Sequence, residues 1–409
     1  MRKACAILFS VFLASLITLS LDIPPARAGV IVVPDDYPSI QAAINAANEG
    51  DTVFVRNGTY YEHVVVDKTL SLIGEGSNTT IIDGNMTGNV VWITQDHVNI
   101  RGFTIQRSGR ASFNSGISIS STKHCDISAN RIVDNEFGVY GSPRNTNIVN
   151  NTIGDNHVGV AIDPGATGNV ISGNHLVANT VSVHLYYADS NHIFQNNMMN
   201  NWRSVTLWYS MNNRLYHNNF LNNTEKIRVF PYANFLDNGC EGNYWSEYNV
   251  TDLNHDGIGD VPYIIDANNT DNYPLMGPFH SFNTSLGKHV NVISDSAINE
   301  FDYFEHNNTI RMYVSKMTTR QTHGFCRLSI PHDLMFEPFN VTINGVNPTY
   351  WNYSLSDNGT HRWIYFSYQH SALEIVIIPE FPSLIILPLF MITTLLTVIV
   401  HRRKDHILS

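Results

Sequence analysis

The segment DLNHDGIGD carries acidic or amide side chains at every second position. A tight loop with this spacing offers several oxygen atoms to one cation, and Ca²⁺ takes about six to eight oxygen ligands in proteins. Gly257 stands where such loops turn sharply, but Tyr263 occupies the twelfth position, where a bidentate Glu is usual. The alternative is a metal-free surface loop. The sequence predicts a Ca²⁺ site with the ligands Asp252, Asn254, Asp256, the carbonyl of Ile258, and Asp260.

Aromatic residues recur at a step of 22 residues and form a second group with chemical potential. The series is Tyr186, Trp208 and Phe230, and Asp163 occupies the equivalent position one repeat earlier. His184 stands two positions before Tyr186, and Arg228 two positions before Phe230. Tyr187 and Tyr209 directly follow Tyr186 and Trp208. Aromatic rings beside a few polar groups suit sugars, which have apolar faces and hydroxyl edges. The alternative is a structural stack of aromatic side chains. The predicted carbohydrate-binding residues are Asp163, His184, Tyr186, Trp208, Arg228 and Phe230.

A catalytic set is harder to find on the same face. Glycoside hydrolysis uses two carboxylates that face each other across the scissile bond, and Asp163 is the only carboxylate in these columns. A lyase needs a base, for which Arg228 is available, but no carboxylate cluster for a cation lies beside it. We therefore favour binding without catalysis, and keep a polysaccharide lyase or hydrolase as the alternative.

The step of 22 residues arises from an internal repeat. The pattern apolar-x-x-Asn-x-apolar-x-x-Asn recurs in five segments, from ISANRIVDN to LYHNNFLNN, and each repeat opens with a strand such as GISISS or SVTLWY. Short strands that stack in register without helical runs predict a right-handed parallel β-helix. The repeated Asn residues are expected to form structural hydrogen-bonded ladders. They are Asn130, Asn151, Asn174, Asn196, Asn218 and Asn243 in the first series, and Asn135, Asn156, Asn179, Asn201 and Asn223 in the second.

The first strand of such a stack must be shielded from edge pairing. A short helix that begins near Pro38 and ends at Gly50 is predicted to provide this cap. Its apolar side would consist of Ile40, Ala43, Ile44 and Ala47.

Two segments resemble a known family over about residues 30–278. The opening of pectate-lyase-like β-helix proteins is similar to VPDDYPSIQAAINAANEGDTVFVRNGTYYEHVVVDKTLSLIGEGSNTTIIDG. The closing segment of the NosD-like, CASH-domain group among them is similar to GNYWSEYNVTDLNHDGIGDVPYIIDANNTDNYPLMGP. This resemblance implies the fold more than the activity, because the fold hosts lyases, hydrolases, epimerases, binding modules and a copper-maturation factor.

The NosD-like resemblance leaves copper binding open as an alternative function. Copper sites use His, Cys and Met. Several His residues fall in the repeats, but mostly in different columns, and are as readily explained as solvated surface residues: His157, His175, His184, His192 and His217.

Residues 280–378 no longer follow the repeat. Strands such as TIRMYVS and RWIYFSYQ alternate with turns such as SDNGT, which predicts a small antiparallel β-sandwich. No catalytic set is evident in it. It resembles the membrane-proximal domain of archaeal surface proteins, which implies a stalk.

The two ends carry targeting signals. Arg2 and Lys3, an apolar run and an A-x-A site that ends at Ala28 predict a signal peptide. The apolar residues 384–400 and the following HRRK predict a membrane anchor with a cytoplasmic C-terminus. The preceding PEFPS resembles the archaeal PEF-type sorting tail, which implies processing there. The expected domains are 1–28, signal peptide; 29–278, β-helix with a Ca²⁺-loop clasp; 279–378, sandwich stalk; and 379–409, anchor.

The overall composition agrees with a surface protein. The formal net charge is −11 and no run of Lys or Arg occurs outside the ends, which argues against a nucleic-acid partner. Asn-x-Ser/Thr sequons are frequent in the outward part, as in a secreted glycoprotein. We expect a membrane-anchored surface protein that binds a polysaccharide of the envelope or the environment; a purely structural envelope protein is the remaining alternative.

Overall fold

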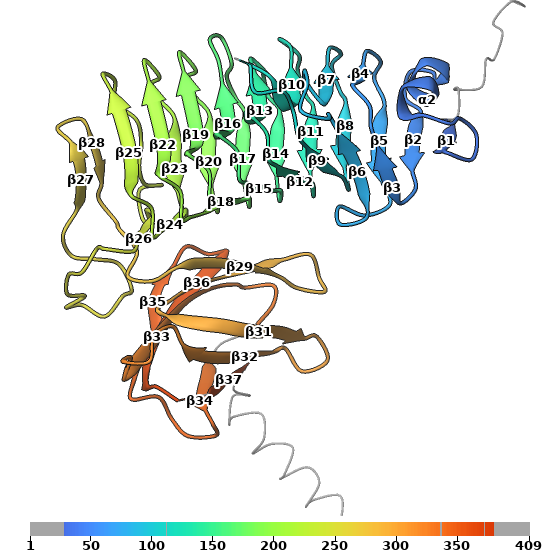
Figure 1. The fold of residues 1–409 in the computed structure, drawn as a ribbon. Helices are drawn as coiled ribbons and strands as arrows, with labels where there is room; N and C mark the ends of the chain where they lie inside the picture. The colour runs from blue at the N-terminus through green and yellow to red at the C-terminus, as the bar shows by residue number, and fades with distance from the viewer. Residues whose placement is uncertain (1–27, 112, 336–337, 372, 380–409) are drawn as a thin grey trace, which may run out of the picture.

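The computed structural model describes residues 28–111, 113–335, 338–371 and 373–379. Residues 1–27 of the expected signal peptide (1–28) and residues 380–409 of the expected anchor (379–409) lie outside the described residues. Within the described ranges, no helix has the length and apolar character needed to span a bilayer. The rest of the predicted fold class is confirmed: the chain forms a parallel β-helix followed by antiparallel sheets (Figure 1).

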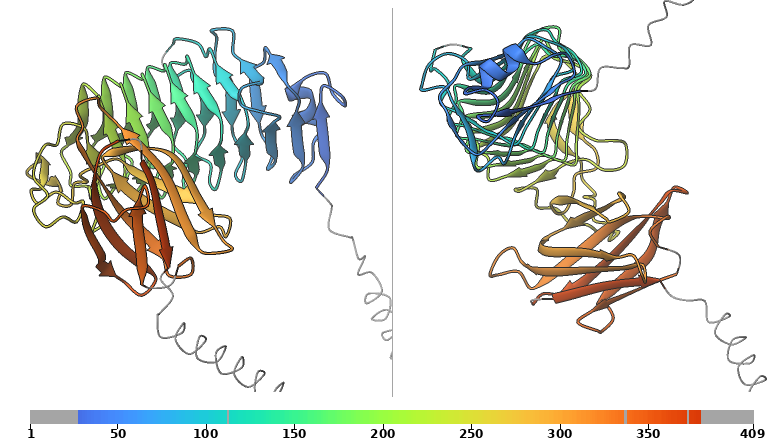
Figure 2. Two further views of the ribbon diagram at one scale, coloured as in Figure 1. Left: turned by 90° about the horizontal axis from the view of Figure 1, so that it is seen from below. Right: turned by 90° about the vertical axis from the view of Figure 1, so that its right-hand side faces the viewer.

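Three parallel sheets, here called A, B and C, make up the β-helix, and each coil contributes one short strand to each sheet. The right panel of Figure 2 shows how successive coils superimpose. Sheet A contains β1 (Val30–Val33), β2 (Thr52–Val55), β5 (Ser71–Gly74), β8 (Asn99–Arg101), β11 (Asp126–Ser128), β14 (Asn147–Val149), β17 (Val170–Ser172), β20 (His192–Phe194) and β23 (Arg214–Tyr216). Sheet B contains β3 (Gly58–Tyr60), β6 (Thr80–Asp83), β9 (Thr104–Gln106), β12 (Arg131–Val133), β15 (Thr152–Gly154), β18 (His175–Val177), β21 (Asn197–Met199), β24 (Asn219–Leu221) and β26 (Tyr244–Trp245). Sheet C contains β4 (Val64–Val66), β7 (Val91–Ile93), β10 (Ser115–Ile119), β13 (Phe137–Gly141), β16 (Val158–Ile162), β19 (Val181–Tyr186), β22 (Arg203–Trp208) and β25 (Glu225–Phe230).

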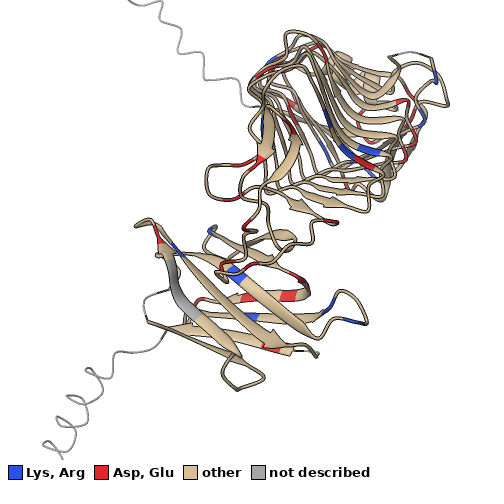
Figure 3. Cartoon of the chain, turned by 90° about the vertical axis from the view of Figure 1, so that its left-hand side faces the viewer, with Lys and Arg blue, Asp and Glu red and all other residues tan. Residues whose placement is uncertain are grey.

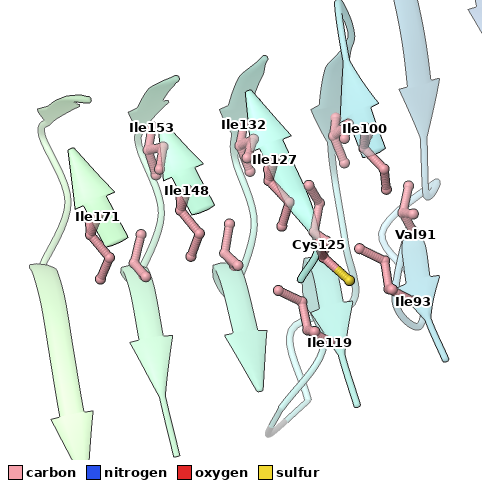
Figure 4. Packing of buried hydrophobic residues seen from close by; sticks show 14 of the residues in the cluster. Val91, Ile93, Ile100, Ile119, Cys125, Ile127, Ile132, Ile148, Ile153 and Ile171 are labelled. Carbon is pink, nitrogen blue, oxygen red and sulfur yellow. The ribbon is translucent and has the colours of Figure 1, made fainter. Parts of the chain in front are cut away.

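Stacked aliphatic side chains fill the interior of the β-helix. In sheet A, Ile100, Ile127, Ile148 and Ile171 are direct partners from strand to strand, and all are fully buried (Figure 4). Because one coil is too thin to bury its own apolar side chains, each coil depends on its neighbours for a core. This mutual dependence places the outward side chains of successive coils directly above one another.

Buried Asn ladders occupy the three turns of the coil. The two ladders predicted from the sequence are present: that from Asn130 to Asn243 lies between sheets A and B, and that from Asn135 to Asn223 between sheets B and C. In the first, each Oδ1 accepts the backbone N–H and the Nδ2 of the preceding Asn at 2.9–3.2 Å. Backbone donors that point into these turns are thereby satisfied away from water.

A third ladder, which the sequence analysis missed, runs through the turn between sheets C and A. It continues from Thr146 through Asn169, Asn191, Asn213 and Asn234 with the same bonding. Asn269 ends it by accepting the backbone N–H of Asn234 at 2.8 Å. Every turn of the coil therefore has its own column of side-chain hydrogen bonds.

Helix α2 (Ile40–Ala46) caps the first coils. It begins after Ser39, whose Oγ accepts the N–H of Ala42, and the predicted apolar side of the helix is buried. It ends at Ala46, before the predicted Gly50. The ammonium group of Lys68 donates to three carbonyl oxygens at this C-terminal end, those of Ile44, Asn45 and Ala47.

Aromatic rings close the other end of the stack, near the hairpin of β27 (Tyr263–Asp266) and β28 (Asn269–Asp271). The indole of Trp245 lies between the rings of Phe220 and Tyr263, at centroid distances of 4.4 and 4.3 Å. The buried carboxylate of Asp271 accepts the indole N–H of Trp245 and the backbone N–H of Asn243. Stacked aromatic rings, held by the bond from Trp245 to Asp271, thus cover the last apolar layer of the β-helix.

Two antiparallel sheets that share one hydrophobic core follow the β-helix. The five-stranded sheet contains β29 (Phe279–Asn283), β30 (His289–Ser294), β33 (His323–Pro331), β36 (His361–Gln369) and β35 (Tyr350–Asp357). The four-stranded sheet contains β31 (Ser296–Phe304), β32 (Thr309–Lys316), β37 (Leu373–Pro379) and β34 (Phe339–Ile343).

A buried carboxylate joins this two-sheet domain to the β-helix. Glu241 accepts bonds from the guanidinium of Arg327 at 2.9 and 3.0 Å and from the indole of Trp363 at 3.0 Å, and it pairs with His217 at 2.9 Å. Burial alone raises the pKa of Glu241, but the bond from His217 and the charge of Arg327 outweigh burial and lower the pKa to about 2. The interface therefore contains a buried carboxylate whose ionised form is favoured only because His217 and Arg327 pair with it.

Replacing a central ladder residue should destabilise the β-helix strongly. Asn174→Ala leaves the backbone N–H and Nδ2 of Asn151 without their buried acceptor. We expect a loss of about 2–5 kcal/mol in the free energy of unfolding, since each orphaned buried group costs about 1–3 kcal/mol. Chemical denaturation followed by circular dichroism measures it, with the exposed Asn57→Ala as control. Equal, small losses in both variants would contradict the structural role of the ladder.

Acid should weaken the interface between the two domains. Because folding depresses the pKa of Glu241, its ionisation adds stability that is fully present above about pH 4.3, the unfolded value, and is lost as the pH falls towards about 2. Glu241→Gln should cost about 3 kcal/mol at neutral pH, and this difference from the wild type should vanish near pH 2. Melting curves across that range test this, with the exposed Glu300→Gln as control. A difference that does not change with pH would be inconsistent with the paired carboxylate.

Candidate functional site

The outward face of sheet C holds five of the six residues predicted to bind carbohydrate, and the sixth, Asp163, directly follows β16. The strand register places Tyr186, Trp208 and Phe230 directly beside one another on β19, β22 and β25. His184 and Arg228 belong to the adjacent outward column, with the buried Thr206 between them. The structure thus brings the predicted set together on adjacent coils.

The aromatic side chains form a continuous exposed surface, here called the aromatic ledge. Trp208 and Phe230 meet edge to face at a centroid distance of 6.3 Å, and Tyr187 and Tyr209 stack at 4.8 Å with their planes 6° apart. The ledge also includes Tyr232, which the sequence analysis did not single out and which contacts Tyr209. Its members are Tyr186, Tyr187, Trp208, Tyr209, Phe230 and Tyr232.

Two residues of the aromatic ledge adopt a costly backbone conformation. Tyr187 and Tyr209 have φ values of 48° and 52°, in the left-handed region. For a residue with a Cβ atom this costs roughly 1–2 kcal/mol. The conformation turns both rings so that they stack on the outside of the helix. The same conformation recurs in the turns of other coils, as at Asp155, Ala178 and Asn200, so it is a general feature of this β-helix.

Polar groups lie beside the aromatic ledge. The hydroxyl of Tyr140 donates to Asp163 at 2.5 Å, and burial, this bond and the charge of Asp163 all raise the pKa of Tyr140. The next coil contributes His184, whose buried Nε2 has no partner among the described residues. Burial lowers the pKa of His184, and so does Arg203, while Asp163 opposes them. His184 is therefore held towards its neutral form.

Arg228 is the exposed cation on this face. Its guanidinium lies 5.7 Å from the ring centroid of Trp208, a cation–π arrangement. No carboxylate of the described residues pairs with it, whereas Arg203 on the neighbouring strand donates from Nε to Glu225 at 2.7 Å. Figure 3 shows how sparse and scattered the charged residues are along the coils. An unpaired cation here leaves a site for an anionic ligand group.

The loop proposed to bind Ca²⁺ lies between the last coil and the two-sheet domain. Its carboxylates accept backbone N–H groups of the loop itself: Asp252 from Gly257 at 2.8 Å, and Asp256 from Ile258 at 2.7 Å. Burial, together with the nearby Asp256, raises the pKa of Asp252. The donors are all oxygen atoms, the kind of ligand that a hard cation such as Ca²⁺ takes. Within the described residues, however, the three carboxylates of the loop are not grouped so that they could hold one ion together.

The same loop contacts both domains. Ile258 pairs with Leu275, which in turn pairs with Tyr244 of the last coil, and Arg327 donates to the carbonyl oxygen of Asp256 at 2.7 Å. The loop therefore contacts the end of the β-helix through Leu275 and the two-sheet domain through Arg327, and a change in its conformation would disturb both contacts. It lies away from the aromatic ledge in the fold, at the start of the connection to β29.

The histidines of the repeats do not converge. His157 pairs with Glu136 and His217 with Glu241, while His175 and His192 belong to different sheets. The rings of His97 and His124 stack at 5.1 Å on neighbouring coils, a pair that the sequence analysis did not identify. Within the part of the chain that the structure describes, no three His, Cys, Asp or Glu side chains are placed to hold one metal ion. A preformed copper centre of three such ligands is therefore not supported.

Comparison with known proteins finds similar solved structures and a matching family. The solved structures similar to this chain include an alginate lyase from Paenibacillus sp. str. FPU-7 (15% identity, 53% of this chain and 97% of the lyase, TM-score 0.34). They also include the catalytic domain of a GH87 α-1,3-glucanase in complex with nigerose (12% identity, 54% of this chain and 45% of the glucanase chain, TM-score 0.41). A third is the Dettilon tailspike protein (12% identity, 85% of this chain and 93% of the tailspike chain, TM-score 0.36). At these scores the similarities carry no functional conclusion. None of the curated proteins is a significant match.

The family assignment comes from the sequence of the β-helix. The family described as periplasmic copper-binding protein (NosD) matches residues 44–250, just over half of the chain. The protein therefore belongs to the NosD family, as the resemblance of its two end segments predicted.

Proposed function

We propose that this protein binds carbohydrate outside the cytoplasm through the aromatic ledge of its β-helix. The exposure of the ledge supports this most directly: Tyr186, Trp208 and Phe230 leave 39%, 37% and 51% of their surface in contact with solvent on three adjacent coils. Contiguous exposed aromatic surface of this kind is characteristic of interaction sites in soluble proteins.

The geometry favours sugars over a wholly apolar ligand. Flat rings offer stacking surfaces, while the carboxylate of Asp163 and the guanidinium of Arg228 lie within the same two outward columns. These polar groups can bond to hydroxyl and acidic groups at the edges of a sugar ring. Asp163 is already bonded to Tyr140, and it is the only carboxylate among the described residues of the two outward columns, so the site suits binding better than hydrolysis.

Removing the central ring of the aromatic ledge should abolish glycan binding without unfolding the protein. We expect Trp208→Ala to reduce retention on a glycan array at least ten-fold, because the largest stacking surface is lost. Trp202→Ala is the matched control: Trp202 is 46% exposed and precedes the same strand, roughly 20 Å from Trp208 along the chain. The proposal is wrong if no glycan is retained by the wild type, or if both variants retain it equally.

We further propose that Ca²⁺ binds the loop from Asp252 to Asp260 and stabilises the connection between the domains. The oxygen-only donor set and the raised pKa of Asp252 support this, because a cation would favour the ionised carboxylates. The ion would be structural, since the loop contacts the last coil and Arg327.

Calcium should raise the melting temperature of the wild type by several degrees, and a chelator should reverse the increase. Asp256→Asn should remove the response, because it takes away one ligand charge. Asp67→Asn, at an exposed position outside the loop, retains the response if the site is correctly placed. An identical calcium response in wild type and Asp256→Asn would rule out this loop as the site.

Copper handling is the second candidate function, and membership of the NosD family favours it. The stacked pair His97 and His124 supplies two imidazoles from adjacent coils. Carbohydrate binding ranks first because its residues are already assembled, whereas the described histidines and cysteines do not form a three-ligand centre.

A further inference from the structure

The two-sheet domain turns an unpaired strand edge towards the β-helix. Strand β29 is the first strand of the five-stranded sheet and pairs on one side only, with β30. Its other side faces the β-helix, where β29 lies beside β24 of sheet B (Figure 1). Unpaired edges usually carry bulges, charges or prolines that prevent further pairing, as does β31 with its bulge between Ile298 and Glu300. In contrast, β29 has the uncharged sequence FHSFN and a regular register.

The pairing pattern shows which peptide groups of β29 are free. In an antiparallel pair, hydrogen-bonded residues alternate with residues whose N–H and C=O groups point away from the partner strand. Thr284 donates its N–H to the carbonyl oxygen of Lys288 where the hairpin closes, so the even-numbered residues of β29 bond to β30. The odd-numbered residues therefore direct their peptide groups away from β30. They are Phe279, Ser281 and Asn283.

The β-helix provides a partner for the first of these residues only. Asn219 accepts the N–H of Phe279 through Oδ1 at 2.7 Å and donates from Nδ2 to its carbonyl oxygen at 2.8 Å. These are the two bonds that a residue of a neighbouring strand would form, so one carboxamide takes the place of a strand here. Apart from the strand ladders, no hydrogen bond of the described residues reaches the peptide groups of Ser281 or Asn283.

A groove of about 390 Å³ lies in front of these free peptide groups. One wall is β29, including Ser281 and Asn283. The opposite wall belongs to the β-helix and carries the side-chain amides of Asn150, Gln195 and Asn197. Each amide can both donate and accept a hydrogen bond. The groove thus has backbone hydrogen-bonding groups on one side and amide side chains on the other.

The lining favours an uncharged ligand. Among the described residues that line the groove, none is Asp, Glu, Lys or Arg. The buried Nε2 of His280 has no partner within the same residues, and burial lowers the pKa of His280 to about 4, so its imidazole is neutral at pH 7. The free peptide groups of Ser281 and Asn283 are two strand positions apart, roughly 7 Å. A second peptide backbone has donors and acceptors at this spacing.

We propose that the groove binds an extended, uncharged peptide segment of a partner protein, which adds a strand to β29. The peptide exchanges hydrogen bonds with the backbone of Ser281 and Asn283. The side-chain amides of Asn150, Gln195 and Asn197 bond to its other edge. In strand addition, main-chain bonds supply affinity and side-chain contacts supply specificity. The inference is independent of the carbohydrate function, because the groove is lined by other residues than the aromatic ledge.

An array of capped hexapeptides tests the inference on the full chain. The peptides consist of valine, threonine, serine and alanine, and a parallel set has lysine or glutamate at the central positions. We expect the protein to retain uncharged peptides and to lose most of this retention on the charged set. Ser281→Pro should reduce retention at least about ten-fold, because proline lacks the N–H that the added strand needs, whereas this N–H does not bond to β30. Ser281→Ala is the matched control: it removes the same hydroxyl but keeps the N–H, and should retain peptides as the wild type does.

A variant of the opposite wall tests the groove without altering β29. Gln195→Ala should weaken peptide retention several-fold, and it decides the question if Ser281→Pro lowers the melting temperature. No retained peptide, or equal retention by Ser281→Pro and Ser281→Ala, overturns the inference. Glycan retention that is lost in Ser281→Pro would assign the groove to a sugar and also overturn it. Trp208→Ala should leave peptide retention unchanged, so failure of the carbohydrate function and failure of strand addition are distinguishable.

Discussion

The hydrogen bond from one buried Asn to the next is the interaction on which the rest of the structure depends. Each turn between sheets must point backbone N–H groups into an interior without water, and the side chain one coil further on satisfies them. Three such ladders run through the three turns. The ladder bonds form where successive members are 21, 22, 23 or 25 residues apart, so coils of nearly equal length stay in register.

Because the coils have nearly the same length, equivalent residues of successive repeats lie side by side and form a continuous surface. With the turns in register, residues such as Tyr186 and Trp208 become direct neighbours although they are 22 positions apart. The aromatic ledge on sheet C is a consequence of this register. Outward-facing side chains do not have to pack in the core, so their types can be suited to a ligand instead. This separation explains how one fold supports many activities.

Much of this organisation was predictable from the sequence because the repeat is local and regular. The Asn series, the sheets and the neighbours of Trp208 all follow from one period. The third ladder was missed because Asn169, Asn191 and Asn213 stand among other turn-forming residues, where Asn is common for reasons of backbone conformation alone. The bond from Arg327 to Glu241 joins residues 86 positions apart and belongs to no period. The bond between Tyr140 and Asp163 depends on side-chain rotamers, which spacing does not specify.

A crystal structure of the protein with a bound glycan, chosen from those retained on the array, would test the central claim, that the coil register builds a binding surface, most directly. The account predicts sugar rings stacked on Tyr186, Trp208 and Phe230, across adjacent strands of sheet C. Sugar rings that run parallel to the strands, or that bind on sheet A or B, would contradict it.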